Sequence, residues 1–366
     1  MSISVCIITK NEVEHLEKCL KALQPYDFEI VIVDTGSADN TKKMAANYTD
    51  AIYDFAWCDD FAAAKNYAVQ KAKNDMVFVV DSDEYIMQLD TKKLCEMVAA
   101  HPREVGRIQR INAFVRNGEM NRIHEWVNRI FDRRLFHYEG RIHEQIVPGS
   151  VFEMECVSGN QKLKHETYKT YCTNVEMEHS GYDGSPEAVK KKAERNIRLL
   201  KREYEETPDD TYIMYQLGKS YYMAGNYPEA VRYFELALGY DLEPKLEYVI
   251  DMVESYGYAL LNCGCVETAL LMENIYQEFG KTADFQFLMG LIYMNNGLFT
   301  EAVAEFMKAS KQKTAKAEGV NSYLSYYNAG VIKECLGDTK EAITLYEKCG
   351  NYEKAKTRLK ELRMQR

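Results

Sequence analysis

The stretch Val77-Phe-Val-Val-Asp-Ser-Asp-Glu84 decides the fold, because four apolar residues run directly into a cluster of acids. An apolar run of this length predicts a strand that is buried on both faces, as in a parallel sheet. Such a strand delivers its carboxylates to the carboxyl edge of the sheet, where open α/β folds bind ligands. Asp81 and Asp83 can bind a hard divalent cation, which in turn can hold a diphosphate. The alternative for this motif alone is an acidic turn without a ligand.

The residues around this stretch alternate between strand and helix patterns. Apolar runs predict strands at 4–8, 28–33 and 76–80 and a short strand near 51–55, and helical spacing predicts helices at 12–23 and 61–73. This order predicts an α/β domain with a parallel sheet and helices on both faces. Residues 105–160 are richer in strand-like pieces and turns, which is typical of the variable second half of such a domain.

The pattern changes after residue 182, and the rest of the chain is predicted to be helical. Four internal repeats place a glycine twelve residues before an alanine, in the pairs Gly218 and Ala230, Gly257 and Ala269, Gly290 and Ala302, and Gly330 and Ala342. The distance between successive glycines is near the tetratricopeptide period of about 34 residues, with inserts. We therefore expect two domains, residues 1–182 and 183–366. A repeat domain of this kind offers a groove that suits an extended peptide or a dimer partner.

Bulk properties exclude several classes of protein. The chain has 366 residues with 46 basic and 56 acidic side chains, and a net charge of −10 argues against a general nucleic-acid binder. No apolar run is long enough to span a membrane, and the first residues lead into a strand and not into a signal peptide. The ten cysteines form no Cys-x-x-Cys pair, so we expect reduced thiols in a cytoplasmic protein without structural zinc.

Four motifs in order resemble the successive signatures of family 2 glycosyltransferases of the GT-A fold, a Rossmann-like nucleotide-diphospho-sugar transferase fold. They are Val5-Cys-Ile-Ile-Thr-Lys-Asn-Glu12, Ile30-Val-Ile-Val-Asp-Thr-Gly-Ser-Ala-Asp-Asn-Thr41, Phe61-Ala-Ala-Ala-Lys-Asn-Tyr67 and Asp81-Ser-Asp-Glu84. With Tyr138-Glu-Gly-Arg-Ile-His-Glu144 and the helical repeats, the chain also resembles the sublancin-type peptide S-glycosyltransferases that modify glycocin bacteriocins. The Gly-x-x-His-Glu segment is shared with lipopolysaccharide-core glucosyltransferases.

The resemblance implies a UDP-sugar donor bound by residues at the carboxyl edge of the sheet. Thr9 and Glu12 correspond to the place where the family seats the uridine, although capping of the first helix is an equal alternative for Glu12. Asp34 corresponds to the aspartate that accepts a hydrogen bond from uracil. Lys65 stands where the family usually has arginine, so we expect a cation that faces the diphosphate or uracil, without the planar fork of arginine.

The resemblance also implies a metal and a catalytic base. Asp81 corresponds to the first acid of the Asp-x-Asp motif, which contacts ribose and sometimes metal, and Asp83 to the second, the main ligand of Mg²⁺ or Mn²⁺. His179 corresponds to the histidine that completes metal coordination in many GT-A enzymes. Glu144 is the candidate general base of an inverting transfer, and His143 is a possible supporting residue that orients Glu144, binds phosphate or only packs. Arg129, Arg133, Arg134 and Arg141 lie near this segment, and most are expected to be solvated.

Three functional hypotheses follow from these observations. The first is a metal-dependent inverting transferase that moves a hexose, of the glucose or N-acetylglucosamine type, to a cysteine, serine or threonine of a peptide held by the repeats, with a homodimer as a further option. The second is transfer to a lipopolysaccharide, polysaccharide or lipid-linked glycan. The third is a degenerate transferase that serves as a repeat-based scaffold. An oxidoreductase is excluded because no Gly-x-Gly-x-x-Gly follows the first strand.

Overall fold

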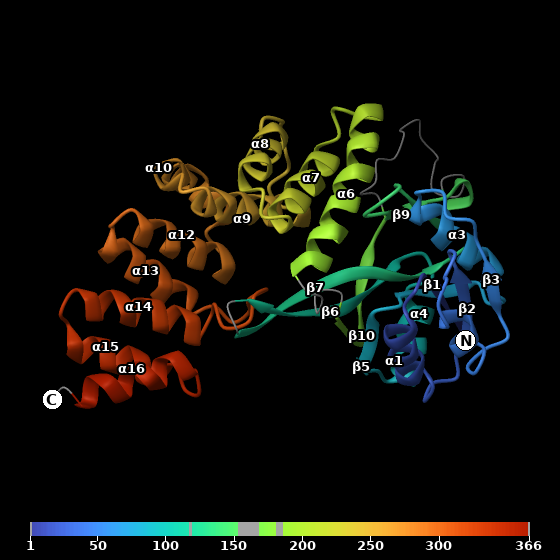
Figure 1. Cartoon of the computed structure of the whole chain (residues 1–366), viewed down its shortest axis with the longest axis horizontal. Coiled ribbons are helices and arrows are strands. Elements are labelled where there is room, and N and C mark those ends of the chain that lie inside the picture. The colour runs from blue at the N-terminus through green and yellow to red at the C-terminus, as the bar shows by residue number, and fades with distance from the viewer. Residues whose placement is uncertain (1, 117–118, 153–167, 181–185, 365–366) are drawn as a thin grey trace. The chain divides into compact units, whose positions relative to one another are not determined.

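The structure is a computed structural model that describes residues 2–116, 119–152, 168–180 and 186–364 (Figure 1). The chain divides into two compact units, residues 1–185 and 186–366, and each is described by itself. The expected boundary after residue 182 falls in 181–185, outside the described residues, and so does Ser185, so we keep this boundary as a proposal.

The first unit alternates strands and helices along its first hundred residues, as expected. The strands are β1 Ile3–Thr9, β2 Glu29–Asp34, β3 Ile52–Asp54, β4 Met76–Asp81, β5 Glu84–Gln88, β6 Val105–Arg116, β7 Glu119–Asp132, β8 Phe136–Glu139, β9 Gln145–Pro148 and β10 Thr170–His179. The helices are α1 Val13–Leu23, α2 Thr41–Ala45, α3 Phe61–Lys71 and α4 Thr91–Ala100.

The main sheet has eight strands in the order β3-β2-β1-β4-β7-β6-β10-β5. Strands β1 to β4 are parallel to one another, which agrees with the prediction for this half. Beyond β4 the sheet is mixed, because β7 runs antiparallel to both β4 and β6 and β5 runs antiparallel to β10, whereas β10 is parallel to β6. The long hairpin formed by β6 and β7 supplies part of this antiparallel pairing, and β8 and β9 form a separate two-stranded sheet.

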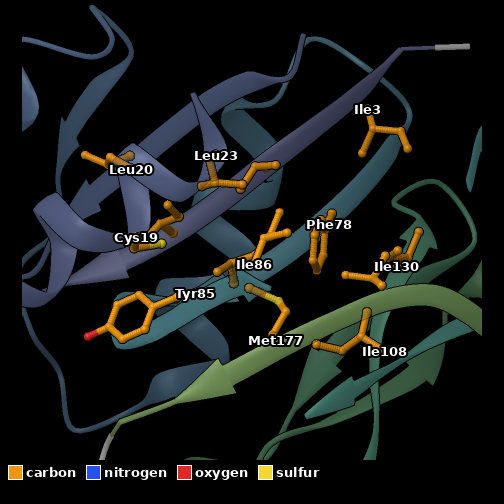
Figure 2. Packing of buried hydrophobic residues seen from close by; sticks show 14 of the residues in the cluster. Ile3, Cys19, Leu20, Leu23, Phe78, Tyr85, Ile86, Ile108, Ile130 and Met177 are labelled. Carbon is orange, nitrogen blue, oxygen red and sulfur yellow. The ribbon is translucent and has the colours of Figure 1, made fainter. Parts of the chain in front are cut away.

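Strand β4 is buried on both faces, as its apolar run predicts. Phe78 and Val80 belong to a core that includes residues of α1 and α4, whereas Val77 and Val79 belong to a second core with residues of α3, β8 and β9. Figure 2 shows part of the first core, in which side chains of α1 face those of the strands. Helices therefore cover both faces of the sheet and leave its carboxyl edge to the loops that follow β1, β2 and β4.

The second unit consists of helices that pack against their sequence neighbours (Figure 1). They are α6 Pro186–Glu206, α7 Thr211–Met223, α8 Tyr227–Leu238, α9 Glu247–Asn262, α10 Val266–Ala269, a 3-10 helix Leu270–Ile275, α11 Tyr276–Phe279, α12 Ala283–Asn295, α13 Phe299–Ala309, α14 Tyr323–Cys335, α15 Thr339–Lys348 and α16 Glu353–Met364. Within the described residues, none of the helices is both long and apolar enough to span a bilayer.

The predicted glycine and alanine pairs explain how these helices approach one another. All four alanines are completely buried. An added Cβ at Gly218 or Gly290 would lie 2.5 or 2.6 Å from the ring of Phe234 or Phe306 in the following helix. Gly218, Gly290 and Gly330 therefore provide the space that an aromatic ring of the next helix occupies, whereas Gly257 makes room for Leu288 and Met272. These close contacts stack the helices.

Candidate active site

The acids of the opening motif meet at a tight turn between β4 and β5. Asp81 is the last residue of β4 and Glu84 the first of β5. Glu84 is completely buried, and its Oε2 atom accepts a hydrogen bond of 3.1 Å from the backbone N–H of Asp81. Glu84 thereby fixes the turn that presents Asp83, so the third acid of the motif has a structural role in this arrangement.

Two cations hold the carboxylate of Asp81. Its Oδ1 atom lies 2.8 Å from Nζ of Lys65, and its Oδ2 atom lies 2.6 Å from a terminal nitrogen of Arg129. Burial disfavours the ionised form of Asp81, yet Arg129 and Lys65 outweigh it and hold the pKa of this carboxyl well below its usual range. Both oxygens of Asp81 are thus engaged by cations, and its expected roles in contacting the ribose and a metal remain predictions.

Lys65 joins Asp81 to the candidate base Glu144. Its side chain is buried, with 3% of the residue exposed, and its Nζ atom lies 2.6 Å from Oε1 of Glu144. Burial disfavours the ammonium, but Asp81 and Glu144 raise the pKa of Lys65 above its ordinary value. The sequence led us to expect a lysine that faces the diphosphate, whereas here Lys65 contacts two carboxylates and sets their separation.

Arg129 is an exception to the expectation that most arginines of this region are solvated. Only 6% of Arg129 is exposed, and besides Asp81 it contacts Oε1 of Glu84 at 2.7 Å. Burial opposes its charge, but Asp81 and Glu84 keep the pKa of Arg129 well above its ordinary value. Arg110 adds a contact of 3.4 Å to Glu84, so a buried network of alternating charges supports the turn.

Asp83 and His179 form the second group of the site. Nε2 of His179 lies 3.3 Å from Oδ2 of Asp83, and Nδ1 of His179 lies 2.7 Å from Oδ1 of Asn112. The strand register explains this meeting, because His179 of β10 pairs with Glu84 of β5 and with Asn112 of β6. Among the residues that the structure describes, no group of three or more His, Cys, Asp or Glu side chains is arranged to hold a metal.

Thr9 and Asp34 form a third group at the same edge. They are register partners at the ends of β1 and β2, and Asp81 pairs with the residue before Thr9. Oδ1 of Asp34 accepts backbone hydrogen bonds of 2.9 and 2.8 Å from Gly36 and Ser37. Within the described part of the chain, Oδ2 of Asp34 and Oγ1 of Thr9 are buried without a hydrogen-bond partner. Buried oxygens of this kind are costly unless a ligand or water satisfies them.

The remaining predicted residues flank these groups. The side chain of Glu12 makes no capping hydrogen bond to α1, which leaves its donor-binding role as a proposal. His143 has a left-handed backbone with φ of 53°, in the loop that carries Glu144. Asn66 bonds both backbone groups of Tyr138, at 2.8 and 2.9 Å, and so ties α3 to β8 in a structural role.

Comparisons with known proteins agree with this arrangement. Residues 4–157 match the model of Glycosyl transferase family 2, and residues 211–241, 283–314 and 323–349 match tetratricopeptide repeats. The chain carries a family 2 glycosyltransferase domain followed by tetratricopeptide repeats. The sequence-based predictions of fold and family are thereby confirmed.

Three relatives share parts of this sequence. The glycosyltransferase SunS of Bacillus subtilis is 22% identical over 80% of this chain and 67% of its own length. A TPR repeat-containing protein of Synechococcus elongatus is 24% identical over 64% of this chain, which spans just over half of that relative (56%). The lipopolysaccharide core biosynthesis glycosyltransferase LpsC of Rhizobium meliloti is 29% identical over 49% of this chain and 73% of its own length.

Proposed function

We propose that the chain is a metal-dependent, inverting transferase that moves a hexose from a UDP-sugar to a cysteine, serine or threonine of a peptide. The observation that carries this proposal is the convergence of three groups at one sheet edge within a family 2 domain. These are the oxygens of Thr9 and Asp34, the Asp83 and His179 pair, and Glu144 linked through Lys65 to Asp81.

The first group, Thr9 and Asp34, suits the uracil of the nucleotide-sugar donor. A uracil ring offers an N–H donor and carbonyl acceptors, so it satisfies Oδ2 of Asp34 with the N–H and Oγ1 of Thr9 with a carbonyl. Both oxygens lack partners inside the described part of the protein. In the same arrangement Glu12, next to the loop after β1, contacts the nucleoside. Lys65 and Arg129 fix the carboxylate of Asp81. Each of its oxygens can accept a further hydrogen bond, and we propose that a ribose hydroxyl donates it.

The second group suits a divalent metal. Oδ2 of Asp83 and Nε2 of His179 lie next to each other. Asn112 contacts the other ring nitrogen of His179 and orients the imidazole, as polar neighbours of metal-bound histidines do. Asp83 and His179 would hold Mg²⁺ or Mn²⁺, with the diphosphate and water as the other ligands. When bound, this ion neutralises charge on the leaving UDP.

Glu144 is the residue proposed to accept the proton of the acceptor. As the acceptor sulfur or oxygen attacks the anomeric carbon, its proton passes to Glu144 and UDP leaves with the electrons of the broken bond. The contact between Lys65 and Glu144 holds the Glu144 carboxylate near Asp81, which the same lysine contacts. His143, next to Glu144 in the chain, is proposed to support the loop conformation.

The acceptor is proposed to be a peptide because the repeats offer a surface for extended chains and because SunS aligns over most of this chain. A glycan acceptor is the second candidate, favoured by the likeness to LpsC. A scaffold without activity is the third, but Asp34, Asp81, Asp83 and Glu144 are all present. A homodimer is compatible with each of these.

A donor screen tests this proposal. Purified protein is incubated with a panel of UDP-sugars and Mn²⁺, and released UDP is measured for the wild type and for Asp83→Ala. Release from one sugar that disappears in the variant supports the proposal and identifies the donor. Cysteine- and serine-containing peptides and lipopolysaccharide cores are then compared as acceptors of that sugar. Absence of UDP release in the presence of every acceptor, together with absence of UDP binding, would overturn it.

A further inference from the structure

Helix α9 packs against both α7 and α12 (Figure 1). Charged residues of these helices and of the loop before α14 form a partly buried group. Asp251 of α9 is at its centre. Oδ2 of Asp251 accepts hydrogen bonds of 2.7 Å from the hydroxyl of Tyr215 and 2.5 Å from Nζ of Lys219, both on α7, and Oδ1 pairs with Nζ of Lys316. Asp251 is therefore fully neutralised by two lysines.

Asp284 at the start of α12 holds the loop that carries Lys316. Its two carboxylate oxygens accept backbone hydrogen bonds of 2.8 Å each from Lys316 and Ala317. Burial raises the pKa of Asp284, and these backbone bonds oppose the rise. Asp284 therefore has hydrogen-bond donors, although no side-chain cation pairs with it among the described residues.

Glu254 is the member of this group that has no partner. It lies one helical turn after Asp251, only 9% of it is exposed, and no hydrogen bond or ion pair engages its carboxyl within the described part of the chain. Its pKa is raised to about 8, first by burial and also by the nearby Asp284, while Lys219 opposes the shift. Ionisation of a largely buried carboxyl is unfavourable unless a cation compensates it. The oxygens of Glu254 are not among the fully enclosed, unpartnered oxygens of the described residues, so an incoming cation can reach them.

The charges of the group decide what kind of partner fits. Three carboxylates (Asp251, Glu254 and Asp284) face two lysines (Lys219 and Lys316), which leaves one negative charge uncompensated when Glu254 is ionised. The described residues offer no three-ligand arrangement for a metal ion, so an organic cation fits better.

Aromatic side chains beside the group suit the stem of a long basic residue. The rings of Tyr212, Tyr215 and Tyr248 cluster with centroid separations of 5.5 to 5.8 Å across α7 and α9. Aliphatic stems pack on such rings while their charged ends reach a carboxylate.

We propose that this face of the repeat domain binds a lysine or arginine side chain of the acceptor peptide, with the carboxylate of Glu254 as its partner. The inference rests on the proposed function in one respect, that the acceptor is a peptide. It adds a sequence preference to that function: the acceptor carries a basic residue away from the glycosylated position.

Binding of a cation to Glu254 has a defined pH signature. The charged groups that face this residue are Asp251 on its own helix, Lys219 on α7, Asp284 on α12 and Lys316 in the loop before α14, whereas Glu235 of α8 bonds Tyr256 on another side of α9. The cation binds only the ionised carboxyl. Affinity therefore falls about tenfold for each pH unit below the pKa of Glu254.

The test uses the full chain and dye-labelled peptides that contain a central cysteine. One arginine is moved through the flanking positions, and a matched set carries uncharged citrulline instead. Fluorescence anisotropy between pH 6 and pH 9 compares the wild type, Glu254→Gln, and Glu267→Gln, whose glutamate is exposed and serves as the matched control. Thermal unfolding shows whether each variant is folded, and UDP release is recorded separately.

We expect that the peptide with arginine at one particular flanking position binds the wild type and the control variant at least about tenfold more tightly at pH 9 than the peptide with citrulline at the same position. That preference is expected to disappear in folded Glu254→Gln. Equal binding of both peptide sets, or a preference that survives Glu254→Gln, overturns the inference even if UDP release is normal. If the protein binds the arginine peptide selectively but releases UDP from none of the donors, the binding site at Glu254 is supported and the proposed transferase activity is rejected.

Discussion

Nε2 of His179 lies 3.3 Å from Oδ2 of Asp83, although Asp83 belongs to the turn between β4 and β5 and His179 ends the distant strand β10. Strand β10 runs between β6 and β5, and this register sets His179 beside both Asn112 and the turn after β4. The pair therefore depends on three strands at once, because β10 is antiparallel to β5 and parallel to β6.

The first prediction concerns Asp83. Asp83→Asn removes the only carboxylate of the proposed metal pair, so UDP release should fall at least about a hundredfold, as expected when a metal ligand is lost. Stabilisation of the wild type by UDP together with Mn²⁺ should also disappear, measured as a shift in melting temperature. Asp50→Asn, an exposed site, is the matched control. Unchanged metal-dependent stabilisation in Asp83→Asn would reject the assignment of this ligand.

The second prediction concerns Lys65. Lys65→Met leaves Glu144 without its cation and Asp81 with only Arg129, so we expect a loss of about 3 kcal/mol in unfolding free energy. Urea denaturation measures this loss, and Lys73→Met, at an exposed position, should change it little. Lys65→Arg keeps the charge and should retain more stability than the methionine variant. If both substitutions are equally harmless, the bridge between the two carboxylates has no energetic role.

The third prediction concerns Glu144 and separates the two kinds of acceptor. Glu144→Gln should reduce transfer to serine peptides by about a hundredfold or more, in the range typical of general bases. Transfer to matched cysteine peptides should fall less, because a thiol ionises more readily than a hydroxyl. The measurement is the initial rate with each peptide at saturating donor. Full activity of the variant on serine peptides would show that another residue accepts the proton.

The sequence was sufficient to predict the parts of the fold that depend on local pattern. The apolar run before Asp81 predicted a strand buried on both faces, and the glycine and alanine spacing predicted the stacked helices. It was not sufficient for the mixed half, because the alternation in β6 and β7 does not reveal which strand lies beside β4.

The charge network was missed for a similar reason. Arg129 and Glu84 are ordinary charged residues in the sequence, and nothing in their neighbours shows that both are buried as partners. Arg129 lies in β7 among several other charged residues, and Glu84 follows two aspartates, so neither position stands out as buried. Charged residues are rarely buried unless they are paired, and the pairing itself depends on the fold. The contact of Asn112 with His179 could not be predicted from the sequence either, because it depends on the pairing of β6 with β10.

The fourth prediction concerns pH and Glu254. Its pKa is raised from 4.5 in the ordinary carboxyl to about 8 in the fold, so the folded state favours the neutral form. The neutral carboxyl therefore makes its full contribution to stability below the ordinary pKa of 4.5, and this contribution is lost as the pH rises through the raised pKa of about 8. The melting temperature of Glu254→Gln should exceed that of the wild type by a margin that grows between pH 5 and pH 8. A margin that does not change with pH would contradict a buried, titrating carboxyl.

The last prediction tests the glycine contacts that stack the repeats. A Cβ at Gly218 would lie 2.5 Å from the completely buried ring of Phe234, so Gly218→Ala forces the two helices apart. Overpacking of this kind costs about 1–3 kcal/mol. Gly239 has a right-handed helical conformation and its added Cβ would come no closer than 3.3 Å to a carbonyl oxygen, so Gly239→Ala should have a much smaller effect. Denaturant unfolding of both variants provides the comparison, and equal stabilities would mean that Phe234 can move aside without cost.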